Sequence, residues 1–286
     1  MSRTTIACFD EQARADSAIG DYAAWAARRL RTPLCLLHVL EHHGYRPEDY
    51  SGQIGLGARE QMLEQMTEEE GRAARQAREQ GRQMLEALQA RLADDTLTPE
   101  VQQRHGVLGE TLREQCTHDD LLVLGRCGHQ HDCGEGRGSL GAHLEDLAQH
   151  LEVPMLIAPE RFRVPARAMV ALDGSERGLE QLSRLAQRGW LEGLETHVVH
   201  VSEPADERPA ERGARLLSAA GLNAQAVTLE GNAGRKLPAY AQEHEIDLVA
   251  MGAYGHSSLR RFLMGSMTHK LLEAMPGAVL LMRDLK

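Results

Sequence analysis

The chain has 286 residues, of which 42% are hydrophobic, so about two domains are expected and each half can bury its own core. The formal net charge of −10 argues against a nucleic acid or an anionic membrane as partner, because both select a basic face. No apolar run approaches the ~20 residues of a membrane span, and five scattered cysteines do not suggest a disulfide framework. We expect a soluble, cytoplasmic protein with reduced thiols and no signal peptide.

The chain begins with two apolar strand patterns. Residues 5–10 predict a strand that ends in Asp10, and a second strand ends in the sequence Leu37-His38-Val39. Because His38 lies inside an apolar run, we expect a histidine of the core or its rim rather than a catalytic base.

Residues 56–94 form a long helical pattern that is rich in Glu, Gln, Arg, Ala and Met. We expect a largely exposed helix, with Gly71 and Gly81 as the points at which it could break. The interpretation that we favour is an amphipathic helix that packs one stripe on the sheet. The alternative is a helix that recognises a partner. The apolar positions at helical spacing are Met62, Leu63, Met66, Met84, Leu85, Leu88 and Leu92.

An apolar run from Asp120 to Leu124 leads into a glycine loop of the form Gly-x2-Gly-x9-Gly-Ser. Glycines let backbone N–H groups approach a phosphate, and the free amides of a following helix add partial positive charge. The loop also holds four Cys and His residues whose chemistry suits zinc but whose spacing is not that of a Cys-x2-Cys site. A polar loop with incidental histidines is the interpretation we favour, so no metal is assigned. The glycine pattern is Gly125, Gly128, Gly138 and Ser139, and the Cys and His residues are Cys127, His129, His131 and Cys133.

After a short linker, residues 159–165, the second half repeats these patterns. Its first strand ends in Asp173, its second in His200-Val201, and a second loop from Gly252 has the same glycine spacing. We expect His200, like His38, to be a core or rim histidine. Asp10 and Asp173 are 163 positions apart, but Gly125 and Gly252, the first glycines of the two loops, are only 127 positions apart. The first half therefore carries about 36 extra residues before its loop.

The alternation of strands and helices in each half predicts an α/β fold. Such alternation forms a parallel sheet with helices on both faces, and ligands bind at the carboxyl ends of the strands where the strand order reverses. We place the two domains at residues 1–158 and 166–286, with the inserted helix at about 56–94 in the first.

The strand-one aspartate, the valine that ends strand two and the repeated glycine loop resemble the universal stress protein family. Across nearly its whole length the chain is similar to the tandem, two-domain form of that family. The resemblance implies two Rossmann-like domains with five-stranded parallel sheets, and it implies binding of ATP or AMP, with magnesium as a companion of ATP. Members commonly pair through the last strand, so here that pairing would be internal, and a homodimer would be a further level of assembly.

The resemblance also implies a nucleotide site in each half, of which the second is the better. The first-half loop holds Asp132 and Glu135, which would repel phosphates, and it has Gly141 where Thr268 falls. In the second half Asp173 and Val201 would contact the adenine, Met251 and Gly252 the base and ribose, and Gly255, Gly265, Ser266 and Thr268 the ribose and phosphates. The counterparts in the first half are Asp10, Val39, Leu124, Gly125, Gly128, Gly138 and Ser139.

Motifs of nucleotide-hydrolysing enzymes and of serine hydrolases are missing. The sequence contains neither Gly-x4-Gly-Lys-Ser/Thr nor Gly-x-Ser-x-Gly. We therefore predict an adenine-nucleotide-binding protein with a regulatory or protective role in the stress response, not an enzyme. Two alternatives stay open, namely a nucleotide-free interaction scaffold and a slow ATPase.

Overall fold

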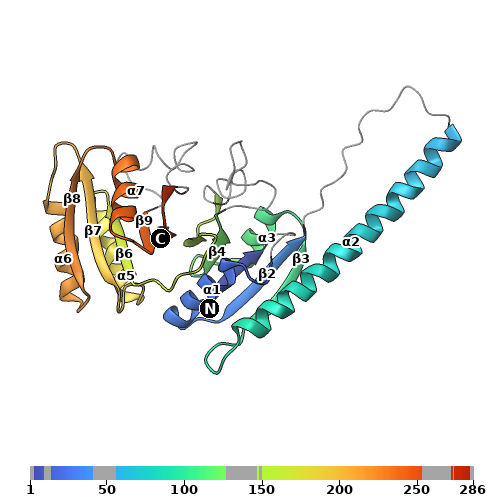
Figure 1. Cartoon of the computed structure of the whole chain (residues 1–286), viewed down its shortest axis with the longest axis horizontal. Coiled ribbons are helices and arrows are strands. Elements are labelled where there is room, and N and C mark those ends of the chain that lie inside the picture. Colours follow the sequence, from blue (N-terminus) through green and yellow to red (C-terminus); the bar gives the residue numbers. More distant parts are fainter. Residues whose placement is uncertain are drawn as a thin grey trace.

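The computed structural model describes residues 3–9, 14–40, 56–126, 147, 150–252, 272 and 274–283, and for residues 56–70 and 73 it describes the backbone alone. Strands and helices alternate in both halves (Figure 1). The first half contains β1 (Thr5–Phe9), α1 (Ala18–Leu30), β2 (Leu34–Leu40), α2 (Leu56–Leu92), β3 (Glu100–His105), α3 (Leu108–Gln115), β4 (Leu121–Gly125) and β5 (Met155–Ala158). The second half contains β6 (Arg167–Leu172), α5 (Glu176–Gln187), β7 (Glu195–Ser202), α6 (Arg208–Ala219), β8 (Ala224–Glu230), α7 (Ala233–Glu243), β9 (Leu248–Gly252) and β10 (Ala278–Met282).

These strands form one 10-stranded sheet in the order β3-β2-β1-β4-β5-β10-β9-β6-β7-β8. Within each half all pairs are parallel, and the third, second, first, fourth and fifth strands lie side by side. At the centre β5 and β10 pair antiparallel, with Ile157 opposite Val279. The predicted α/β fold with two Rossmann-like halves is confirmed, and the last strands of the halves pair with each other inside one chain.

The central strands are apolar because helices cover both faces of the sheet. Every residue of β1, β2, β5 and β10 is buried, as is typical of parallel strands in a doubly wound sheet. By contrast, β3 and β8 lie at the two edges of the sheet and expose several side chains. The sequence pattern of each strand therefore reflects its distance from the centre.

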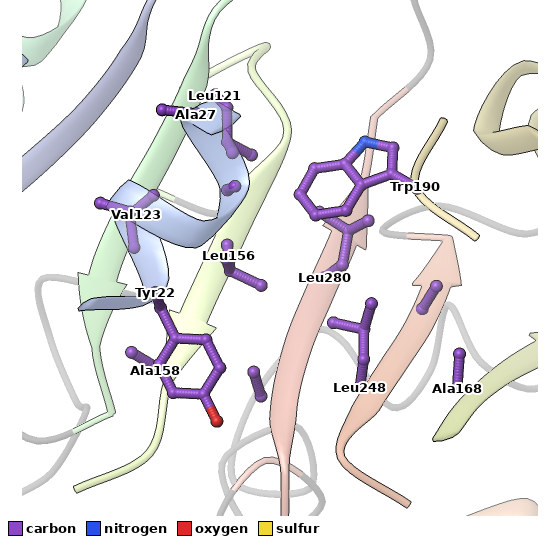
Figure 2. Packing of buried hydrophobic residues seen from close by; sticks show 14 of the residues in the cluster. Tyr22, Ala27, Leu121, Val123, Leu156, Ala158, Ala168, Trp190, Leu248 and Leu280 are labelled. Atoms are coloured by element: carbon purple, nitrogen blue, oxygen red, sulfur yellow. The ribbon is translucent and has the colours of Figure 1, made fainter. Parts of the chain in front are cut away.

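Two clusters of buried side chains fill the two faces. Helices α1, α2, α5 and α6 pack into one cluster, and α3 and α7 into the other. The first cluster crosses the seam between β5 and β10, where Figure 2 shows Leu156 of the first half alongside Leu280 and Trp190 of the second. Arg29 of α1 adds hydrogen bonds of 2.6–3.3 Å to the carbonyl oxygens of residues 189, 190 and 192. The halves thus share the core on this face of the sheet.

Helix α2 is the main difference between the halves. It runs for 37 residues through both Gly71 and Gly81, whereas its counterpart α6 has 12 residues. The break considered at those glycines is not observed. The extra residues of the first half lie between β2 and β3, and Figure 1 shows α2 reaching well beyond the sheet. Among the described residues, no helix is both long and apolar enough to cross a membrane.

Candidate functional site

The described site residues of the second half lie at the carboxyl ends of three adjacent strands. Asp173 follows β6, Val201 lies near the end of β7, and Gly252 ends β9. Strand β6 pairs with both neighbours, and the register of the two ladders brings the three ends to nearly the same level. The strand order reverses between β6 and β9: α5, which follows β6, packs in the first cluster, and Leu272, which comes after β9, packs in the second. Ligand crevices form at such a point.

Residues 173–175 form a turn that hydrogen bonds hold in place. Gly174 has a φ of +82°, a conformation that favours glycine. Ser175 is the N-cap of α5, and its hydroxyl accepts a 3.0 Å hydrogen bond from the Gly178 amide. Asp173 Oδ1 accepts hydrogen bonds from the Ser175 amide at 2.9 Å and from the Ser175 hydroxyl at 2.6 Å. The carboxylate therefore lies at a helix start, where the helix dipole favours negative charge.

The buried ring of His200 lies beneath this turn. Its Nδ1 donates a 2.9 Å hydrogen bond to the carbonyl oxygen of Leu172, the residue before Asp173. A Cβ on Gly174 would lie 3.2 Å from His200 Cε1 and 3.4 Å from Pro209 Cγ, so the ring and the first turn of α6 pack against the turn. The histidine is thus buried at the rim of the core, as predicted, and it supports the turn that carries the aspartate.

Strand β9 forms the other wall of the crevice. A Cβ at position 252 would lie 2.7 Å from Gln181 Oε1 of α5, so glycine makes room for this buried side chain. Met251 is 0% exposed and packs in the second cluster, so its side chain supports the strand end from within the core. Val201 is half-buried and keeps part of its surface accessible.

The first half has a corresponding edge. Val39 lies near the end of β2, and Leu124 and Gly125 end β4, so the topology brings them to one edge of the sheet. Val39 is only 2% exposed, whereas Val201 is half-buried. Leu124 and its counterpart Met251 are both buried, so the described strand ends of the two halves differ in accessibility at this valine.

Several predicted residues lie outside the described part of the chain. In the second half these are Gly255, Gly265, Ser266 and Thr268, and in the first half Asp10, Gly128, Gly138 and Ser139. The Cys and His residues that suit zinc, Cys127, His129, His131 and Cys133, also lie outside it. Within the described residues, no group of three or more His, Cys, Asp or Glu side chains is arranged to hold a metal ion.

Cys8, Cys35 and Cys116, which lie in the described part of the first half, are not joined in a disulfide. Burial raises the pKa of Cys35 to about 11, and the charge of Glu100 adds to the effect. Burial likewise raises the pKa of Cys116 to about 12, with contributions from Asp120 and Cys35. Thiols with such pKa values carry little thiolate at neutral pH, so neither residue is a candidate nucleophile.

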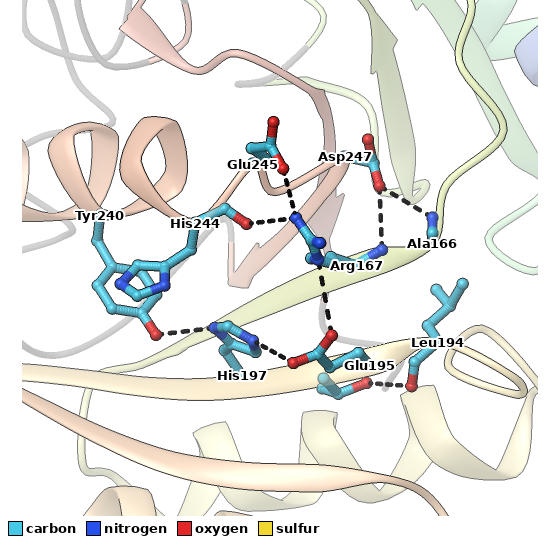
Figure 3. Close-up of polar contacts among 10 residues, drawn as sticks. Ala166, Arg167, Leu194, Glu195, His197, Tyr240, His244, Glu245 and Asp247 are labelled. Atoms are coloured by element: carbon cyan, nitrogen blue, oxygen red, sulfur yellow. Dashed lines mark hydrogen bonds and ion pairs between the residues drawn. The ribbon is translucent and has the colours of Figure 1, made fainter.

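A second polar cluster lies at the opposite, amino edge of the strands in the second half (Figure 3). His197 of β7 is buried, with its Nδ1 2.8 Å from the hydroxyl of Tyr240 on α7 and its Nε2 3.3 Å from Glu195 Oε1. Arg167, at the start of β6, lies 3.6 Å from Glu195 Oε2 and 2.8 Å from Glu245 Oε2. These contacts tie α7 to the starts of β6 and β7, so the cluster has a structural role away from the crevice.

Two residues of the crevice edge, Gln181 and Gly178, were not predicted from the sequence. Gln181 occupies the buried stripe of α5 beside Leu182 and Leu185, so a polar residue at an apolar helical position was the available signal. Gly178 lets the Asp173 carboxylate approach the helix, because a Cβ there would lie 2.9 Å from Oδ1. The signal for Gly178 was a glycine inside a helical pattern, which usually has a packing reason.

Comparisons with known proteins agree with this architecture. The profile of the universal stress protein family matches residues 1–159 and 204–283, which is more than half of the chain. Universal stress protein Slr1230 of Synechocystis sp. is 28% identical over 259 residues, covering 88% of this chain and 90% of that protein. A crystal structure of a universal stress protein from Archaeoglobus fulgidus has a TM-score of 0.65 and 16% identity, covering 99% of this chain and 97% of that one. A functionally unknown protein from Pseudomonas aeruginosa PAO1 has a TM-score of 0.58 and 16% identity, covering 98% of this chain and 92% of that one. These structural likenesses concern the fold, and together with the sequence match they lead to one conclusion: this chain belongs to the universal stress protein family.

Proposed function

We propose that the second half binds an adenine nucleotide, ATP or AMP, in the crevice between β6 and β9, and that binding serves a regulatory or protective role in stress. The observation that carries this proposal is the fixed Asp173 turn. It holds a carboxylate at the end of a central strand, where the strand order reverses, next to a strand that ends in Gly252. Doubly wound folds bind ligands at this point, and the resemblance to nucleotide-binding members of the family supports the choice of ligand.

In this proposal the adenine amino group donates a hydrogen bond to the Asp173 carboxylate, and Val201 packs on the base. The segment after β9 supplies backbone amides and the hydroxyls of Ser266 and Thr268 to the phosphates, and magnesium accompanies ATP. Three charge-assisted hydrogen bonds contribute on the order of 5–9 kcal/mol before costs, while a micromolar site needs about 8 kcal/mol net. Burial of the base must therefore supply part of the affinity.

Three features favour the second half over the first. Val201 is more accessible than Val39. The position that corresponds to Gly174 is Glu11 in the first half, and glutamate adopts a positive φ at a cost that glycine avoids. The first-half loop also carries Asp132 and Glu135, whose charge opposes phosphates.

A pair of matched variants tests which half binds. Asp173→Asn keeps an oxygen that can accept from Ser175 but removes the charge, and Asp10→Asn makes the same change in the first half. We expect calorimetry to show an ATP or AMP affinity about ten- to a hundredfold lower in Asp173→Asn, the loss of one charge-assisted hydrogen bond, and little change in Asp10→Asn. A loss confined to Asp10→Asn would move the site to the first half.

Two further measurements address the identity of the ligand. Mass analysis of the small molecules released when freshly purified protein is denatured names the ligand directly. Gly265→Val should abolish binding, because a side chain would stand where a phosphate must approach. A purified protein that carries no nucleotide and binds none in calorimetry would leave the scaffold alternative.

We also propose binding without appreciable turnover. Phosphoryl transfer needs a metal-holding carboxylate and an oriented nucleophile near the terminal phosphate, and Asp173 is assigned to the base. Phosphate release from saturating ATP with magnesium should therefore be far below about one per second, the low end of typical enzymes. Release at that rate that disappears in Gly265→Val would support the ATPase alternative.

The domain boundaries at 158 and 166 are part of the same proposal. The intervening residues contain no helix or strand, and Arg161, Arg163 and Val164 are exposed. Limited trypsin digestion should cut first in this linker and leave two fragments that stay associated through the β5–β10 seam. Separation of the fragments on a sizing column without denaturant would contradict the proposal.

A further inference from the structure

Among its described side chains, helix α2 packs on the rest of the molecule only toward its C-terminal end. The buried ones are Leu85, Leu88 and Leu92, and Gly81 is the first buried position in the described stretch from residue 71 on. Before it, the described side chains at positions 72, 74–76 and 78–80 are all exposed, and Ala77 is half-buried. Figure 1 shows this part of α2 extending past the edge of the sheet.

The apolar stripe of α2 nevertheless continues beyond the sheet. From Leu85 and Gly81 it passes through Ala77, Ala74 and Gly71 at steps of three and four residues; after a step of five residues, past Thr67 and Glu70, Met66 and Leu63 follow. Residues 56–80 amount to about 37 Å of helix at 1.5 Å per residue. Most helical stability in proteins comes from packing an apolar face rather than from propensity, so a helix that extends this far from the sheet indicates a partner.

Charge along the same segment is divided between its two ends. Residues 56–70 contain five glutamates and one arginine, whereas residues 72–82 contain four arginines and one glutamate. The basic stretch is unusual in a chain with a net charge of −10. Gly71 lies between the two stretches, and a Cβ placed on it would meet nothing within 4 Å.

We propose that residues 56–80 of α2 pair antiparallel with the same segment of a second copy of this chain, with the two-fold axis near Gly71. In this arrangement the acidic end of each helix lies beside the basic end of the other, so both ends gain opposite charges at once. A parallel pair would place like charges together, which is destabilising. A contact of this kind is isologous and closes as a dimer, and glycine at its centre allows the helix backbones to approach closely.

The sheet supports the same assignment. The last strands β5 and β10 already pair with each other inside the chain, so they are not available to another copy. A second copy must therefore use a different surface, and α2 offers one whose apolar stripe and charges are complementary to themselves. The contact is independent of the proposed nucleotide site.

Charge reversal in the full-length protein tests the proposal by sedimentation equilibrium. The variant Arg75→Glu/Arg78→Glu makes the whole segment acidic, and Glu64→Arg/Glu68→Arg makes it basic. We expect a dimer for the unaltered chain, a dimer constant weakened about tenfold or more in each variant alone, and a restored dimer when the two variants are mixed. The dimer should also weaken between 0.05 and 1 M salt in the unaltered chain, because exposed charges are screened.

A matched control has the same change in charge elsewhere. Arg161→Glu/Arg235→Glu alters two exposed arginines away from α2 and should leave the dimer constant unchanged. Circular dichroism confirms that each variant keeps its helices. A monomeric unaltered chain, a dimer that survives both reversals, or a mixture that stays monomeric would each overturn the proposal, and a monomer would point to α2 serving a different partner.

Discussion

The histidine near the end of the second strand occupies corresponding positions in the two halves. His38 on β2 lies opposite Phe9 in register, and His200 on β7 lies opposite Leu172. In the second half Nδ1 of the histidine donates to the strand-one carbonyl, beside the Asp173 turn. In the first half Nδ1 accepts a 3.1 Å hydrogen bond from Gln103 Nε2 on β3. The two corresponding histidines therefore have different roles. His200 supports the Asp173 turn, whereas His38 links β2 to β3 beneath α2.

The length of the following helix explains this difference. In the second half α6 begins at Arg208, so Pro209 in its first turn lies against Gly174 of the Asp173 turn, as the His200 ring does. In the first half α2 begins far upstream, and it is the middle of the helix, at Gly81, that covers His38. Extending a helix at its start has moved the helix terminus away from the crevice edge. The comparison indicates that the insertion changes the environment of that edge as well as adding a surface.

The largest effect is expected where α2 crosses His38. A Cβ on Gly81 would overlap the His38 ring and lie 2.5 Å from Gln103 Nε2, so Gly81→Ala should destabilise the first half by about 2 kcal/mol through overpacking. Gln76→Ala, at an exposed position of the same helix, should instead change its stability by less than about 0.5 kcal/mol. Chemical unfolding followed by circular dichroism measures both. Equal behaviour of the two variants would show that α2 does not rest on His38.

The two histidines should differ in their effect on ligand binding. His200→Leu removes a buried hydrogen bond, so we expect a loss of about 1–2 kcal/mol of stability and, on the proposed function, about tenfold weaker nucleotide binding. His200→Asn, whose amide can still donate to the Leu172 carbonyl, should restore most of the affinity. His38→Leu should cost similar stability and leave affinity unchanged. If His200→Leu binds nucleotide normally while folded, the support that His200 gives to the turn is irrelevant to binding.

Replacing two glycines one at a time separates the effect of the Asp173 turn on binding from its effect on stability. Gly174 and Gly193 both have positive φ, +82° and +69°, so replacement of either by alanine should cost about 1 kcal/mol of stability. A Cβ at 174 would press on His200, whereas one at 193 would meet nothing within 4 Å. Nucleotide affinity, measured by calorimetry, should therefore fall in Gly174→Ala alone. Equal affinities in the two variants would argue against a ligand at the Asp173 turn.

The thiols also distinguish the halves, because all five cysteines lie in the first. The folded pKa values of about 11 for Cys35 and about 12 for Cys116 exceed the unfolded value of about 8.5. The contribution of each thiol is therefore fully present below that unfolded value and is lost as the pH rises through 11 and 12. Unfolding free energies measured from pH 8 to 10.5 should decline less steeply in Cys116→Ala than in the unaltered chain. Identical slopes would show that Cys116 does not titrate as its burial requires.

Sequence patterns predicted the fold because each half repeats the same signals. Apolar runs at strand spacing, the strand-end aspartates and the duplicated glycine loops define the alternation of strands and helices, and burial of both sheet faces turns it into a parallel sheet. The pairing of β5 with β10 was not readable from pattern alone, since nothing in the two apolar runs specifies an antiparallel partner. That expectation came from the resemblance to the family.

At the site, the sequence indicated the strand ends but not how neighbouring side chains constrain them. Met251 lies at the predicted position, yet its side chain is part of the core. Successive residues of a strand face opposite sides of the sheet, so Met251 and position 252 face opposite sides. Gln181 was not predicted because its closeness to Gly252 depends on how α5 packs across the sheet. Such contacts join residues distant in sequence and leave only a weak local signal, a polar residue in an apolar stripe.

The antiparallel seam also has a consequence for synthesis of the protein. β5 is complete at Ala158, but its partner β10 begins only at Ala278, about 120 residues later. At 5–20 residues per second this interval lasts roughly 6–24 s. Throughout it, the apolar strand Met155–Ala158 is an edge without its final neighbour, and such edges readily accept a strand from another chain. Neighbouring ribosomes on one message would bring several such strands together, so exchange of halves between nascent chains competes with closure of the seam until the last strand emerges.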